Sequence, residues 1–167
     1  LYKMFGVNAE LLIDHAWGWE PCTIADIKAY KPKASSMGSG QVLHRPYTFK
    51  QAKLITREMT DLLVLDLVDK RLVTDQLVLT VGYDMENLKD TKIQKLYSGP
   101  TTTDPYGRKI PKSAHGTINL GRQTSSTKLI LAAMTELFER IVDKNLLIRR
   151  VNVAANRVVS DERLQKT

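Results

Sequence analysis

Two adjacent arginines, Arg149 and Arg150, interrupt the run LLIRRVNVAA (residues 146–155), which otherwise has the apolar composition of a buried strand. A guanidinium group presents a rigid fork of N–H donors that matches phosphate oxygens, so an arginine pair at such a position can grip a phosphate backbone. The alternative is a purely structural role, as a cross-strand ion pair with an acid such as Asp84. Arginines on strands often do no more than face solvent. The two arginines are therefore candidates for phosphate binding.

The stretch SSMGSGQ, residues 35–41, is a second candidate for contact with phosphate. Because it lacks bulky side chains, its backbone N–H groups can approach a phosphate closely, and its serine hydroxyls can add contacts. The alternative is a poorly packed edge strand. The stretch is weak evidence alone and gains weight if it lies on the same sheet as the arginines.

The overall charge favours a polyanionic partner. Lys and Arg total 25 against 18 for Asp and Glu, which gives a formal net charge of +7. Nucleic acid is the first candidate and an acidic membrane surface is the second. No apolar run approaches the roughly 20 residues that cross a bilayer, so we expect a soluble protein without a membrane segment.

Disulfide and metal chemistry are not indicated by the sequence. Cys22 is the only cysteine, which excludes an internal disulfide and fits a reducing cytoplasm. The histidines His15, His44 and His115 are far apart and have no acidic or cysteine companions at ligand spacing. We expect a cytoplasmic protein with no cofactor of its own.

The chain length suits one domain and a smaller additional piece. Residues 1–22 are expected to form two short helices, the first ending at Gly6 and the second beginning after Asn8. Residues 23–33 are polar and rich in lysine, as in a tether. Residues 34–159 form the second module, and residues 160–167 are a tail.

The second module has the pattern of a mixed α+β domain. Strands are expected over residues 33–43, 75–84, 114–121 and 146–155, and amphipathic helices over 48–71 and 124–144. The long polar segment between the second and third strands is expected to be a connection. The order β-α-β-β-α-β predicts a four-stranded sheet with two helices on one face, preceded by a short helical remnant. The stripes expected to face the sheet are Phe49, Ala52, Ile55, Met59, Leu62, Leu63 and Leu67 in the first helix, and Leu129, Ile130, Ala133, Met134, Leu137 and Ile141 in the second.

Two helices cover one face of such a sheet and leave the other face open. Alternation along the last strand places Val151 and Val153 inward and Arg150 and Asn152 outward. Arg149 falls on the inward side of this alternation, but it lies at the start of the strand. There its aliphatic stem can lie along apolar surface while its guanidinium reaches the edge of the sheet. The outward set is polar and has no acid until Asp84, whereas acids cluster on the helices. The full outward set is a serine of the first strand, Gln76, Thr80, Thr117, Asn119, Arg150 and Asn152.

Several of these segments together resemble the C-terminal region of Y-family translesion DNA polymerases. The similar pieces are FGVNAELLIDHAWG, the lysine-bearing tether, the strand SSMGSGQ and the late IRRVNV. The resemblance implies the end of a thumb domain followed by the little finger, also called the polymerase-associated domain. The segment HGTINLGRQTSSTK is similar to the branch that contains the catalytic subunit of polymerase V.

The resemblance also implies a set of residues that contact DNA. The phosphate-contacting strand of the family maps onto Ser36, Gly38, Ser39 and Gly40, and its last strand onto Arg149 and Arg150 with Asn152. The third strand of the family usually carries a basic run, but here Thr117 and Asn119 occupy it, with Arg122 just after. Ser39 likewise replaces a second arginine of the first strand, which predicts a weaker grip from these two strands.

The family implies the partners and the chemistry of the parent protein. Its little finger holds double-stranded primer–template DNA in the major groove during lesion bypass in DNA repair, and contacts phosphates largely without reading bases. The Mg²⁺-binding carboxylates belong to the palm, so we expect residues 1–167 to be inactive and the parent to be a DNA-directed DNA polymerase. Binding to a sliding clamp is expected through another segment, because the clamp-like QLVLT (residues 76–80) alternates as a core strand.

Two other classes of domain have the same order of secondary-structure elements and would imply a different function. An RNA-recognition domain needs aromatic side chains on its open face, and Tyr83 is expected to point inward. A regulatory or subunit-interface domain of ferredoxin-like topology would show little salt dependence in any binding of nucleic acid.

Overall fold

The computed structural model describes residues 1–30 and 35–161, so residues 31–33 of the expected tether and residues 162–167 of the expected tail lie outside the described residues. The chain divides into two compact units, Leu1–Lys33 and Ala34–Thr167, and each is described by itself. Within the described residues, no helix has both the length and the apolar character that a membrane span requires.

The first unit is helical, with α1 at Tyr2–Phe5, a 3-10 turn η1 at Gly6–Asn8, α2 at Ala9–Ala16 and α3 at Ile24–Ala29. Gly6 ends α1 with a φ of 56°, a conformation that glycine adopts without steric cost. The expected tether contains α3, which the composition of that segment did not predict. Thr23 starts this helix with a capping box: its hydroxyl accepts from the Asp26 N–H at 3.2 Å, and the Asp26 carboxylate accepts from the Thr23 N–H at 2.9 Å.

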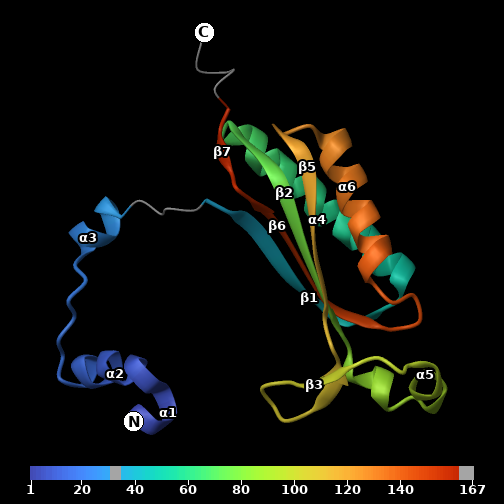
Figure 1. Ribbon diagram of the computed structural model, residues 1–167, viewed down its shortest axis with the longest axis horizontal. Coiled ribbons are helices and arrows are strands. Elements are labelled where there is room, and N and C mark those ends of the chain that lie inside the picture. Colours follow the sequence, from blue (N-terminus) through green and yellow to red (C-terminus); the bar gives the residue numbers. More distant parts are fainter. Residues whose placement is uncertain (31–34, 162–167) are drawn as a thin grey trace. The chain divides into compact units, whose positions relative to one another are not determined.

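The second unit is an antiparallel sheet covered by two helices (Figure 1). The strands are β1 at Met37–Tyr47, β2 at Leu72–Tyr83, β5 at Ala114–Thr124 and β6 at Ile148–Asn156, in the spatial order β1-β6-β2-β5. Helices α4 at Phe49–Asp69 and α6 at Thr127–Ile141 each connect two strands that a third strand separates. The predicted α+β fold with the order β-α-β-β-α-β is confirmed, and the short strand β7 at Val159–Ser160, which pairs with the start of β2, adds to it.

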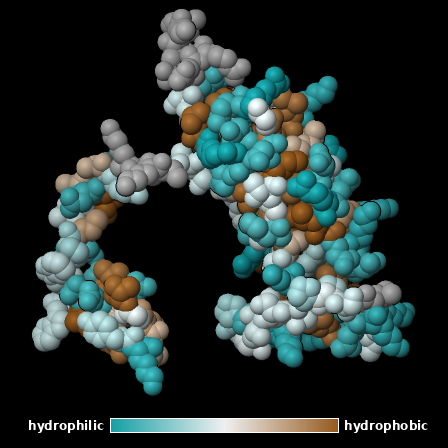
Figure 2. All heavy atoms as spheres, viewed as in Figure 1, coloured by the Kyte–Doolittle hydropathy of each residue, from teal (hydrophilic) through white to brown (hydrophobic). Residues whose placement is uncertain are grey.

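The long connection between β2 and β5 is an ordered insertion. It contains the 3-10 turn η2 at Met85–Leu88, helix α5 at Thr91–Leu96, and a hairpin formed by β3 at Thr101–Thr103 and β4 at Lys109–Pro111. Asn87 is fully buried at its base and bonds three backbone groups: its amide nitrogen donates to the carbonyls of Asp84 (2.8 Å) and Leu147 (2.7 Å), and its oxygen accepts from the Leu147 N–H (2.7 Å). These bonds fix the insertion to the entrance of β6. Figure 2 shows its surface as mostly hydrophilic.

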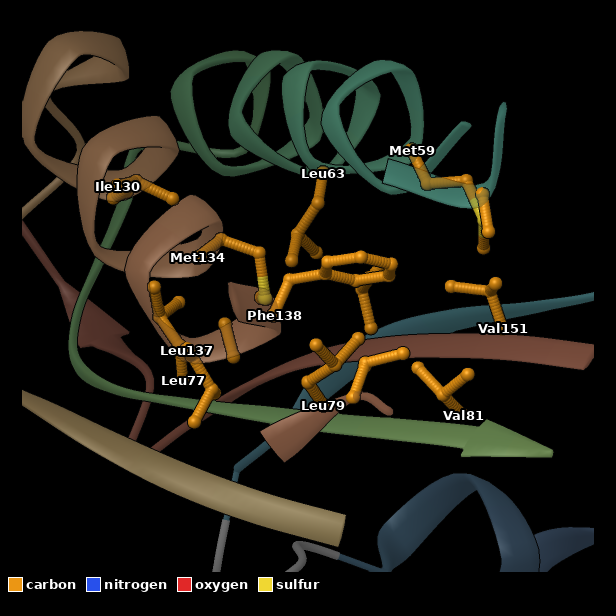
Figure 3. Close-up of a cluster of buried hydrophobic side chains, with 14 of the residues drawn as sticks. Met59, Leu63, Leu77, Leu79, Val81, Ile130, Met134, Leu137, Phe138 and Val151 are labelled. Carbon is orange, nitrogen blue, oxygen red and sulfur yellow. The ribbon is translucent and has the colours of Figure 1, made fainter. Parts of the chain in front are cut away.

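The core lies between the sheet and the two helices (Figure 3). Phe138 of α6 sits at its centre, between Leu63 of α4 and Leu79 of β2. Leu77, Leu79 and Val81 have no exposed surface, as the alternation of β2 predicts. Burial of this continuous apolar set is the main force that holds the helices on the sheet.

The predicted burial is wrong for two residues of the helix stripes. Leu62 of α4 is 63 % exposed and Leu129 of α6 is 37 % exposed, whereas Phe138 is fully buried. Compared with the predicted stripe, the buried face of α4 includes Thr56 and Thr60 in place of Leu62. Their hydroxyls donate to the carbonyls of the residues four positions earlier at 2.8 and 2.6 Å, which lets polar side chains replace leucine there.

Candidate nucleic-acid interface

The face of the sheet opposite the helices is mostly polar or small, and the paired outward positions of its described strands carry no carboxylate. Asp75, in the bulge of β2, lies beside this face and pairs with Arg157 at 2.9 Å. Pairing in register places Gly82, Thr80, Val78 and Gln76 of β2 on this face, because Leu77, Leu79 and Val81 point to the core. Among the paired outward positions of the four described strands there is no Asp, Glu, Phe, Tyr or Trp. The remaining outward residues are Gly38, Gly40, Val42, His115, Thr117, Asn119, Arg150, Asn152, Ala154 and Asn156.

A β-bulge places both arginines away from the core. Gly82 pairs with Arg150, but the next residue of β2, Tyr83, pairs with Ile148, so Arg149 is an extra residue in β6. Ile148 and Val151 are both fully buried, and the two arginines between them are not. The expected inward parity of Arg149 is therefore wrong, because the bulge breaks the alternation at that residue.

The two arginines differ in their partners. Arg149 Nε lies 3.8 Å from Asp84 Oδ2, and the exposed fractions of the two side chains are 40 % and 9 %. The ion pair considered as an alternative thus exists for Arg149, as a long and half-exposed contact. The backbone of Arg150 pairs with β1 and β2, but its exposed side chain has no hydrogen bond or ion pair within the described part of the chain. Arg150 is the side chain on this face that is most available to an anion.

The glycines of β1 have a structural role in the pairing with β6. A Cβ at Gly40 would lie 2.1 Å from the side-chain oxygen of Asn152, and a Cβ at Gly38 would lie 2.8 Å from the carbonyl oxygen of Val153. Both distances are too short for any real contact. Glycine at these two positions therefore allows β6 to pair closely with β1 and keeps this part of the face flat.

The two serines assigned to the same strand lie elsewhere. Ser39 pairs with Val153, whose side chain is buried, so Ser39 is on the helix-covered side of the sheet although it is exposed at the edge. Ser36 precedes β1 and is exposed. The open face thus combines Gly38 and Gly40 with the outward residues of β6, and not with these serines.

The side chains of β2 and β5 bond one another across the open face. Gln76 Nε2 donates to Asn119 Oδ1 at 2.9 Å, and the Thr80 hydroxyl bonds His115 Nδ1 at 2.8 Å. A guanidinium nitrogen of Arg157 also donates to Asn119 Oδ1 at 2.7 Å. Arg157 was not among the predicted residues; it lies in a turn just after β6 with a φ of 52°. No pattern in the sequence indicates that this turn returns the side chain to the sheet.

The remaining predicted residues lie along β5. Thr117 is exposed on the open face, and its carbonyl accepts a hydrogen bond from Arg140 of α6 at 3.1 Å. Arg122 is exposed near the end of β5, just after Gly121, whose φ is 73°. The structure therefore brings six of the ten predicted residues together on the open face, namely Gly38, Gly40, Thr117, Asn119, Arg150 and Asn152, and places Arg149 at the bulge beside them.

The comparisons with known proteins assign the second unit to a family. Residues 34–167 match the family described as impB/mucB/samB family C-terminal domain. Among solved structures, the chain is similar to one titled "Complex of beta-clamp processivity factor and little finger domain of PolIV", with 7 % identity, a TM-score of 0.46, and coverage of 72 % of this chain and 86 % of that chain. No curated protein matches the chain. The family match spans most of the chain, so the chain belongs to the impB/mucB/samB family and carries its C-terminal domain.

Proposed function

We propose that this domain is the little finger of a Y-family DNA polymerase and that it binds double-stranded primer–template DNA through the open face of its sheet during lesion bypass in DNA repair. The observation that carries the proposal is the open face itself: its paired strand positions have no carboxylate, and Arg150 is exposed there without a partner. Phosphate binding by such a face is independent of base sequence. This suits a protein that must accept damaged bases.

The distribution of charge supports an orientation with the open face toward DNA. The exposed acids of the helix layer include Glu58, Asp61, Asp66 and Asp69 of α4. In the same layer Lys53 forms an ion pair with Glu139, and the hydrogen bond and charge of that lysine lower the pKa of the Glu139 carboxyl. The two helices together carry six acidic and five basic side chains, so they attract a phosphate backbone less than the open face with Arg150 does.

The open face does not favour readout of unpaired RNA bases. RNA-recognition domains stack bases on aromatic side chains of the sheet, whereas no Phe, Tyr or Trp occupies the outward positions of the described strands here. Tyr83 points inward and is 6 % exposed, as the sequence predicts. Its hydroxyl accepts from the Asp143 N–H at 2.9 Å and is therefore part of the protein interior.

Two further roles are proposed for the parent protein and assigned to no residue of this domain. Mg²⁺-dependent nucleotidyl transfer is expected of the parent polymerase. Sliding-clamp binding is also expected of it, through a segment other than residues 76–80. Leu77 and Leu79 in that segment are fully buried in the core, so they are not available to a clamp.

The experiment that tests the proposed function is a comparison of three ligands. The affinity of the chain is measured by fluorescence anisotropy for a labelled primer–template duplex, single-stranded DNA and hairpin RNA, each over a salt series. We expect measurable duplex binding that weakens steeply with salt, because binding releases counterions from the phosphates. Duplex binding that is absent or indifferent to salt would contradict the proposal, and preference for hairpin RNA would favour the RNA-binding alternative.

A further inference from the structure

A cleft of about 690 Å³ lies between the end of the sheet and the inserted hairpin. Its sheet side is formed by Gly82, Arg149 and Arg150, and its hairpin side includes Thr103, Tyr106 and Arg108. The hairpin and α5 extend beyond the ends of the strands (Figure 1). The volume is in the range of sites that hold a small molecule or a single nucleotide.

The sheet side of the cleft can bind an anion. Arg150 has no partner among the described residues, and Arg149 makes only the 3.8 Å contact with Asp84. Two of the three carboxylates in the cleft already have partners: Asp84 Oδ1 accepts from the Glu86 N–H at 2.8 Å, and Asp104 pairs with Arg108 at 2.7 Å. Glu86 and Lys89, also in the lining, carry opposite charges. The available positive charge is therefore concentrated on the arginine pair.

The hairpin side carries an exposed aromatic ring on a turn that hydrogen bonds hold in place. Tyr106 is 83 % exposed, and the Arg108 guanidinium carbon lies 4.9 Å from the centre of its ring. Asp104 fixes this turn, because its Oδ1 accepts from the N–H groups of Tyr106 and Arg108, both at 2.9 Å, and its Oδ2 accepts from Arg108 Nε at 2.7 Å. The hydrogen bond from the Arg108 side chain contributes most, with the two backbone N–H groups, to lowering the pKa of the Asp104 carboxyl. The high exposure leaves the ring accessible to another planar group.

We propose that this cleft binds one nucleotide of single-stranded DNA, with its base stacked on Tyr106 and its phosphate on Arg150 and Arg149. A nucleotide combines a phosphate with a planar base and therefore fits a cleft that offers an anion site and an aromatic ring. Bases within a duplex are already stacked on their neighbours and have no free face for Tyr106, so the cleft selects unpaired DNA. The inference rests on the proposed function in taking DNA as the ligand, but it concerns an unpaired strand and adds Tyr106 of the hairpin, while Arg150 is shared with the open face.

The test uses the full chain and three labelled probes: a single-stranded oligodeoxyadenylate, the same strand with abasic sites, and a blunt duplex. We expect Tyr106→Ala to weaken binding of the oligodeoxyadenylate by about 5- to 150-fold, the range for loss of one stacked base. Tyr106→Phe keeps the ring and should bind like the wild type. Tyr30→Ala, which removes a tyrosine of 71 % exposure from the other unit, is the matched control and should also bind normally.

The remaining probes separate the cleft from the open face. The wild type and Tyr106→Ala should bind the abasic strand equally, and both should bind the blunt duplex equally. Unchanged binding of the oligodeoxyadenylate by Tyr106→Ala would overturn the inference, as would an equal loss for duplex and single strand. Displacement of the oligonucleotide by a polyglutamate peptide as efficiently as by unlabelled DNA would overturn it as well. Single-strand binding that depends on Tyr106, without any duplex binding, would refute the proposed function and leave this inference standing.

Discussion

The close contact between Gly40 and Asn152 predicts an energetic coupling between β1 and β6. A Cβ added at Gly40 would lie 2.1 Å from Asn152 Oδ1, so the amide must move by about an ångström or more. The amide is the end of a flexible side chain, and we therefore expect Gly40→Ala to cost only about 1 kcal/mol, comparable to a forced off-rotamer side chain. Asn152→Ala removes the obstacle, and the double variant should be within about 0.5 kcal/mol of the wild type.

Gly38 offers a matched control for this coupling. A Cβ at Gly38 would lie 2.8 Å from the backbone oxygen of Val153 and 2.9 Å from Ala154 Cβ, and backbone cannot turn away as a side chain does. We expect Gly38→Ala to cost about 2 kcal/mol, in the range of a core overpacking variant, and Asn152→Ala not to rescue it.

The assay is urea denaturation of the single and double variants, with the midpoint and the slope m both fitted. We expect a coupling energy of about 1 kcal/mol between Gly40→Ala and Asn152→Ala, because the effects of substitutions at residues in contact are not additive. Additive effects of these two substitutions would mean that Asn152 does not lie over Gly40. The register of β1 on β6, and the flat surface inferred from it, would then be wrong.

Two further predictions concern stability and pH. Leu79→Ala should lower the free energy of unfolding by about 2–5 kcal/mol, because Leu79 is fully buried. Val78→Ala on the open face should lower it by less than about 1 kcal/mol. Similar urea midpoints for the two variants would contradict the assigned faces. Tyr83→Phe should cost about 1 kcal/mol at neutral pH by losing the bond to the Asp143 N–H. Burial raises the pKa of Tyr83, so above the usual value of about 10 the unfolded chain releases this proton first and wild-type stability falls. Tyr83→Phe should lose stability less steeply over that alkaline range, and an equal slope in both proteins would refute this.

The faces of the sheet could be predicted from sequence because they depend on local alternation. Leu77, Leu79 and Val81 are apolar, and the residues between and beside them are polar or small except Val78, which fixes the inward side wherever the strand is regular. The same rule failed at Arg149, because a bulge depends on how β6 pairs with β2 and leaves no trace in the composition of β6 alone. The position of Leu62 was wrong for a similar reason, since buried threonines took the place of leucines in the helix stripe.

The insertion and its cleft could not be predicted from the sequence. Strands β3 and β4 are three residues each, which is too short for a periodic pattern to be distinguished from a loop. The insertion is held in place by Asn87, a residue type that is usually exposed. Asn87 bonds the backbone of Leu147, which lies far away in the sequence. The turn signal at Pro105 and Gly107 was visible, but nothing indicated that it faces Arg150 across a cleft.

The measurement that tests the central claim most directly is the salt dependence of duplex binding in Arg150→Ala. The matched control is Arg57→Ala, which removes an exposed arginine from the helix layer. If the open face binds phosphate through Arg150, the slope of log K against log salt should become shallower by about 0.9, the value for one lost phosphate contact, and Arg57→Ala should keep the wild-type slope. An unchanged slope in Arg150→Ala, or an equal change in both variants, would contradict the claim that the open face of the sheet holds the DNA.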